Sequence, residues 1–153
     1  MISLIRFLNK KVFYSLTILI CLFSCNSKQS SKNSQDELIE NVDTKRVFFK
    51  WPRDGATLAS PVYIDMGLEG MSIEPAGPVK EGYGHHHILI NQTHWPKGSV
   101  IPASDSTLHY GKGQTDVSLD LLPGEYILSL QFADGVHTSF GKEMASSITI
   151  IVE

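Results

Sequence analysis

Cysteine is scarce in this chain of 153 residues, which contains two. Cys21 lies inside an apolar segment near the N-terminus, and Cys25 lies just beyond that segment. Both lie within the first 25 residues, so residues 26–153 contain no cysteine pair that could form a disulfide bond. A domain without disulfides depends on apolar burial for its stability. The part of the chain that follows the N-terminal segments has roughly 110 residues, which is enough to bury a core.

Positive charge is also sparse. The chain has 13 Lys and Arg against 16 Asp and Glu, a formal net charge of −3. Arg6, Lys10 and Lys11 belong to the N-terminal segment, and without them the charge would be about −6. No basic cluster is present beyond residue 45. Nucleic-acid binding is therefore not expected, since it needs a Lys and Arg footprint on phosphates.

Helical periodicity and catalytic motifs are absent as well. No Gly-x-Ser-x-Gly elbow surrounds Ser104 or Ser139, and residues 111–114 lack the spacing of a phosphate-binding loop. Metal-assisted hydrolysis would need an open coordination position beside a carboxylate base, and the sequence indicates no such pair. We therefore predict no catalytic residues.

The N-terminus has the features of a lipoprotein signal. A basic start precedes an apolar run over residues 12–23, which is too short to span a bilayer comfortably. The run ends in Leu22-Phe23-Ser24-Cys25, which resembles the bacterial lipobox, whose cysteine is lipidated. We expect a signal peptide over 1–24 and a lipid on Cys25, followed by a polar, flexible linker that completes the segment 25–45. The alternatives are cleavage near Ser24 that leaves a free cysteine, or an uncleaved anchor.

The residue after the cysteine bears on location. Asn26 stands where an aspartate would retain a lipoprotein at the inner membrane. The expected location is therefore the bacterial cell envelope, with the lipid in the outer membrane rather than the inner one.

From Arg46 onward, short segments with a period of two alternate with turns. Residues 61–68 alternate cleanly between apolar and polar side chains, and 126–132 carry the strongest apolar face. Asp134-Gly135 is a hairpin dipeptide, and Tyr126 has the position of a corner tyrosine. The pattern predicts an all-β domain over 46–153, an antiparallel immunoglobulin-like sandwich of about seven strands. Strands are expected at 47–49, 61–68, 85–91, 115–121, 126–132 and 147–152, with loops at 70–84 and 95–105.

All six histidines lie between positions 85 and 137, and three of them are consecutive. On a strand, His85 and His87 would share one face with Cα atoms roughly 7 Å apart, and His86 would face the other side. Imidazole nitrogens can share one metal ion at about 2.0–2.1 Å, and His109 and His137 are the candidates for further ligands. We therefore predict a copper or zinc site made by His85, His87, His109 and His137.

Other polar residues could support that site. His86 is expected to pack beneath the sheet, while Gln114, Asp134 or Glu81 could orient a ring by hydrogen bonding. His94 is expected to be an ordinary surface residue. The alternative to metal binding is a metal-free interaction domain that binds an envelope protein or a glycan, with the histidines as a hydrogen-bonding scaffold.

The run His85-His86-His87, His109 and His137 belong to a series of short motifs spread in order over residues 54–137. This series resembles a bacterial envelope family described only as a domain of unknown function, family number 4399. The resemblance implies an exported β-domain and draws attention to His85, His86, His87, His109 and His137, with His94 outside the pattern. Relatives often carry a second segment rich in His and Pro where Thr138-Ser139-Phe140 stands here. The matching segments are 54–56, 60–62, 70–71, 75–77, 84–87, 101–102, 108–115, 122–124, and Asp134 with His137.

Overall fold

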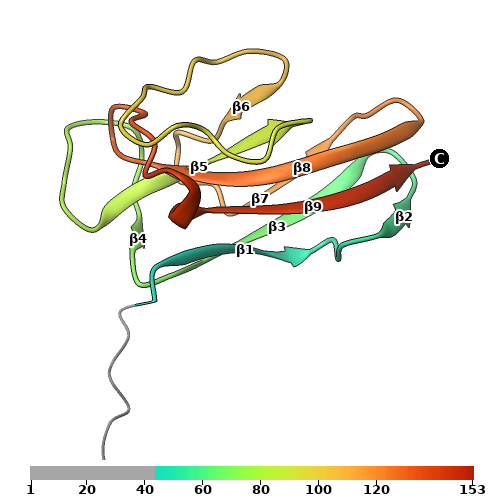
Figure 1. Cartoon of the computed structure of the whole chain (residues 1–153), viewed down its shortest axis with the longest axis horizontal. Helices are drawn as coiled ribbons and strands as arrows, with labels where there is room; N and C mark the ends of the chain where they lie inside the picture. Colours follow the sequence, from blue (N-terminus) through green and yellow to red (C-terminus); the bar gives the residue numbers. More distant parts are fainter. Residues whose placement is uncertain (1–43) are drawn as a thin grey trace, which may run out of the picture. The chain divides into compact units, whose positions relative to one another are not determined.

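The computed structural model describes residues 44–153 (Figure 1). The expected signal over 1–24, Cys25 and most of the linker over 25–45 lie outside these residues. Within them, no helix is long and apolar enough to cross a membrane. The elements are β1 (Arg46–Trp51), β2 (Ala56–Leu58), β3 (Val62–Glu69), β4 (Ser72–Ile73), β5 (Tyr83–Ile90), β6 (Thr107–His109), β7 (Asp116–Leu119), β8 (Gly124–Ala133), the 3₁₀ turn η1 (Lys142–Met144) and β9 (Ala145–Val152).

The strands form two layers. The smaller sheet has the order β1-β3-β7, and both of its pairings are antiparallel. The larger sheet has the order β2-β9-β8-β5-β4, and β6 pairs with β5 on the same edge as β4. Figure 1 shows β6 above β5, with β1 and β3 below the larger sheet. The predicted all-β sandwich is confirmed.

The main core lies between the two sheets. Ile64 and Met66 of β3 meet Leu128, Leu130 and Phe132 of β8, and all five side chains are almost fully buried. The alternation of apolar residues along each strand produces this core, because every second side chain of a strand points to the same face. The sandwich therefore rests on apolar burial, as the absence of a cysteine pair requires.

The outer face of the larger sheet is covered by loops. Leu89 and Ala133 point away from the main core and pack with Ile101 and Trp95 in a second, smaller apolar cluster. Gln131 fixes this cover, because its side-chain oxygen accepts a hydrogen bond from Trp95 N at 2.8 Å and its amide nitrogen donates to Gly141 O at 3.0 Å. The covering loops and the face beneath them form the surroundings of the histidines.

The structure differs from the sequence-based strand pattern in several details. Nine strands are present among the described residues, because β2 and β4 are short parallel additions at the two edges of the larger sheet and β6 is a three-residue strand. β4 lies within the segment predicted as a loop. Asp134-Gly135 does not form a two-residue hairpin, since residues 134–144 separate β8 from β9. Such short pairings depend on tertiary contacts that local sequence does not encode.

The corner tyrosine is present. The hydroxyl of Tyr126 donates a hydrogen bond to Leu122 O at 2.9 Å, four residues back along the chain. The bond fixes the entry into β8, the strand that contributes most to the core.

Candidate metal centre

β5 presents its three consecutive histidines to different layers. His86 shares a face with Ile88, which belongs to the main core, whereas His85 and His87 share the outer face with Leu89. His85 and His87 have 0% and 1% of their surface exposed. Two imidazoles are thus fixed side by side on a rigid strand, and their ring centroids are 4.9 Å apart.

His109 reaches the same place from β6. The antiparallel register sets His109 directly opposite His87. Gly111 follows closely, and an added Cβ there would collide with the ring of His109. The glycine therefore leaves the space that this ring occupies.

His137 is delivered by the turn that follows β8. Its φ angle is +70°, a left-handed conformation that is uncommon for residues other than glycine. Asp134 Oδ1 holds the turn by accepting hydrogen bonds from Val136 N at 3.0 Å and Thr138 N at 2.8 Å. Gly135 packs against the backbone of residues 77–78, where an added Cβ would lie 2.5 Å from Gly77 O. These contacts fix the His137 ring over the outer face of β5.

The four imidazoles converge from three segments of the chain. Every pair of ring centroids among them is separated by 4.5–5.9 Å. One nitrogen from each of His85, His109 and His137 lies within 4.8 Å of the other two, an arrangement that could hold a metal ion. The His87 ring lies beside the rings of His85 and His109, with centroids 4.9 and 5.2 Å away, but its nitrogens are not part of this group of three.

The closest pair already has a spacing that suits a shared ion. His109 Nε2 and His137 Nε2 are 3.1 Å apart. Two nitrogens at 2.0–2.1 Å from one ion would be about 2.9 Å apart at a right angle and about 3.4 Å apart at the tetrahedral angle. The observed distance falls between these values, so the pair could bind a metal with little movement.

The site favours neutral imidazoles. Burial, together with the neighbouring histidines, lowers the pKa of His85 to about 4 and that of His87 to about 3. Burial and His137 also lower the pKa of His109. Both ring nitrogens of His85 and of His87 are buried without a hydrogen-bond partner among the described residues. Neutral imidazoles with free nitrogen lone pairs are the form that binds transition metals.

Of the other residues discussed from the sequence, His86 lies in the main core, Asp134 lies in the turn that carries His137, and His94 lies on the surface. His86 packs edge-on against Phe132 with ring centroids 5.3 Å apart, inside the main core. The Gln114 side-chain oxygen accepts a hydrogen bond from Lys112 N. Asp134 accepts hydrogen bonds from the backbone of the His137 turn, and its charge offsets a small part of the lowering of the His85 pKa. His94 is exposed and contacts Thr93.

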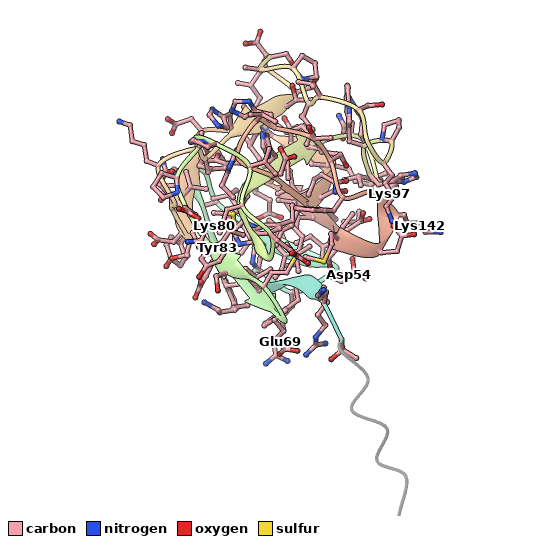
Figure 2. The ribbon with its side chains drawn as sticks, turned by 90° about the vertical axis from the view of Figure 1, so that its left-hand side faces the viewer. Asp54, Glu69, Lys80, Tyr83, Lys97 and Lys142 are labelled. Carbon is pink, nitrogen blue, oxygen red and sulfur yellow. The ribbon has the colours of Figure 1, made fainter. Side chains whose placement is uncertain are left out.

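Glu81 lies in the loop that precedes β5 and is exposed. In the same loop, Lys80 Nζ lies 3.5 Å from the ring centroid of Tyr83, the first residue of β5 (Figure 2). The Glu81 carboxylate makes no hydrogen bond to a histidine ring within the part of the chain that the structure describes. This loop therefore positions the start of β5 through Lys80 and Tyr83.

Sequence reasoning did not identify several residues that shape the site. Ile101 and Ala103 line a small pocket together with His109 and His137. Gln131 is paired with His87 across β5 and β8 and anchors the covering loops. A polar Gln among the alternating residues of 126–132 was the one available signal, since a buried amide must find hydrogen-bond partners.

The fold and the site together define an all-β sandwich with a four-histidine cluster on the outer face of its larger sheet. The sequence model of DUF4399, a domain of unknown function, matches residues 64–153, and the chain belongs to this family. No curated protein and no solved structure matches the chain. The matched segment contains the cluster, the turn that delivers His137 and the pocket beside it.

Proposed function

We propose that this protein is a non-catalytic binding module that holds a copper or zinc ion through His85, His87, His109 and His137. The observation that supports this function is the clustering of four imidazoles on the outer face, where nitrogens of His85, His109 and His137 lie within 4.8 Å of one another. Two of these rings are fully buried with unpartnered nitrogens among the described residues, which is costly unless a ligand uses them.

The ligand set favours copper over zinc where both are available. Imidazole suits both metals, and Cu²⁺ precedes Zn²⁺ in affinity for a given nitrogen site. A Cu(I) thioether site is not supported, because Met66 and Met144 are buried in the main core and Met71 packs against it. Neutral nitrogen donors alone thus define the proposed centre.

Metal titration of the purified protein, produced without a His tag, tests this function. We expect one Cu²⁺ or Zn²⁺ to bind with micromolar or tighter affinity, as measured by calorimetry and metal analysis. The variant His85→Ala/His87→Ala should lose this binding. His94→Ala is the matched control, because this histidine is exposed and lies outside the cluster.

Unchanged affinity in the double variant, or no binding to the wild-type protein, would rule out the proposed centre. The metal-free interaction domain would then be the better hypothesis, with an envelope protein or a glycan as its partner.

We also propose that the domain is held in the bacterial envelope by a lipid on Cys25, in the outer membrane rather than the inner one. Incorporation of labelled palmitate should disappear in Cys25→Ser and persist in Cys21→Ser. Cys21 is the control because it lies within the expected signal peptide. Label retained by Cys25→Ser would refute the anchor without bearing on the metal centre.

A further inference from the structure

The cluster is open on one side. His85 and His87, which belong to β5, are buried, but His109 is exposed and His137 is half-buried. Beside these two outer rings lies a pocket of about 170 Å³, lined by Ile101, Ala103, His109 and His137. A metal held by the four rings would therefore have a cavity next to its outer ligands.

The size of the pocket limits what could occupy it. Sites for drug-sized ligands have volumes of about 300–1,000 Å³. At about 170 Å³ this pocket is smaller than such sites, so it suits a small ligand. A large organic substrate is therefore not the expected occupant.

The charge of the site selects the chemical class of that ligand. Four neutral imidazoles leave both charges of a divalent ion uncompensated, and a partly buried charge without a counter-charge is costly. The carboxylate of Asp134 accepts hydrogen bonds through Oδ1 from two backbone N–H groups of the His137 turn, and its negative charge, which acts on His85, could offset only one of the two charges. Ile101 and Ala103 offer only apolar side chains on the other wall. An anion from solvent would supply the missing negative charge.

We infer that the pocket admits a small monovalent anion, which donates an electron pair to the metal at a further coordination position on its open side, next to His109 and His137. This inference rests on the proposed metal centre. The anion adds to the coordination shell and replaces no histidine, so the metal remains bound when the anion leaves.

Azide added to the Cu²⁺-loaded full-length protein tests the inference. We expect a new azide-to-copper charge-transfer band and a changed electron paramagnetic resonance spectrum, both saturating with azide concentration. Ala103→Phe should fill the pocket and weaken azide binding by about tenfold or more, while Cu²⁺ affinity stays unchanged. Ala59→Phe is the matched control, because Ala59 is also an exposed alanine but does not line the pocket.

The outcomes separate the two proposals. If Cu²⁺ binds but azide leaves both spectra unchanged, the anion position is refuted and the metal centre stands. Equal azide affinity in Ala103→Phe and the wild-type protein would refute the assignment to this pocket. If no Cu²⁺ binds, the metal centre fails and the anion position fails with it.

Discussion

Adjacent residues of one strand occupy opposite environments in this protein. His85 lies among other imidazoles on the outer face, whereas His86 lies in the apolar core against Phe132. Both rings are fully buried, and burial lowers the pKa of each to about 4. Only His85 has neighbours with which it could share a ligand, so the two unpartnered rings should respond differently to substitution.

Replacing His86 with leucine tests this difference. Both nitrogens of His86 are buried and have no hydrogen-bond partner among residues 44–153. A buried polar group without a partner costs about 1–3 kcal/mol, so His86→Leu should raise the free energy of unfolding by about 1 kcal/mol. Urea unfolding would measure the change, and Cu²⁺ affinity should not change. A loss of metal binding in a folded His86→Leu protein would instead make His86 part of the site.

Gly111 offers a test of how His109 is positioned. A Cβ at this position would overlap the His109 ring, so Gly111→Ala should displace the ring and weaken metal binding by about tenfold or more. Gly77→Ala is the control, because its added Cβ would meet no atom closer than 3.9 Å. Calorimetric titration of both variants would measure the effect. Equal affinities in the two variants would show that the ring does not need the space beside Gly111.

On the scale of an element, the turn between β8 and η1 connects the sheet to the site. Asp134→Ala would remove the acceptor of two backbone hydrogen bonds and loosen the turn that carries His137, so metal affinity should fall about tenfold. Asp134→Asn keeps a side-chain oxygen that can accept both bonds and should restore most of the affinity. Metal titration of both variants separates the effect of losing the hydrogen-bond acceptor from the effect of losing the negative charge. If Asn behaves like Ala, the negative charge of Asp134 is what matters.

The same turn shows where sequence reasoning succeeds and where it stops. The alternation of apolar residues in β3 and β8 predicted these strands, because a period of two is a local property of the chain. Asp134-Gly135 was predicted as a hairpin dipeptide, but it lies in a longer connection between β8 and β9 whose shape depends on Gly135 contacting residues 77–78. A contact between segments so distant in sequence has no local signal.

The candidate site shows a similar division. The facing of His85 and His87 follows from strand geometry, and the sequence nominated His109 and His137 as partners. The register that sets His109 opposite His87 is a tertiary feature, as is the pocket formed by Ile101 and Ala103. Residue types could therefore suggest the chemistry, whereas the distances and the open side required the fold.

For the molecule as a whole, the two buried faces of the larger sheet have separate roles. Its inner face makes the apolar core with β1, β3 and β7, and its outer face carries the histidines under the covering loops. Because the core does not include His85 or His87, the sandwich should fold without metal. When the free metal concentration exceeds the dissociation constant, metal binding should raise the free energy of unfolding in proportion to the logarithm of the ratio of the two.

The buried histidines make the stability of the whole domain dependent on pH. The folded-state pKa values of His85 and His86 are about 4 and that of His87 is about 3, whereas an unfolded chain binds these protons near pH 6.5. Since the unfolded state binds more protons below that value, the histidine contribution to stability is fully present above about pH 6.5 and is lost as the pH falls toward about 4.

Urea unfolding of the metal-free protein should therefore give a lower midpoint at about pH 5 than at about pH 7.5. The variant His85→Gln/His87→Gln removes two of the four histidines whose pKa is lowered, so its midpoint should depend less on pH over this range. His94→Gln removes an exposed imidazole and should retain the full dependence. If the urea midpoint depends equally on pH in the two variants, protonation of other groups governs the acid sensitivity. The rings on the outer face would then remain accessible to protons in the folded protein.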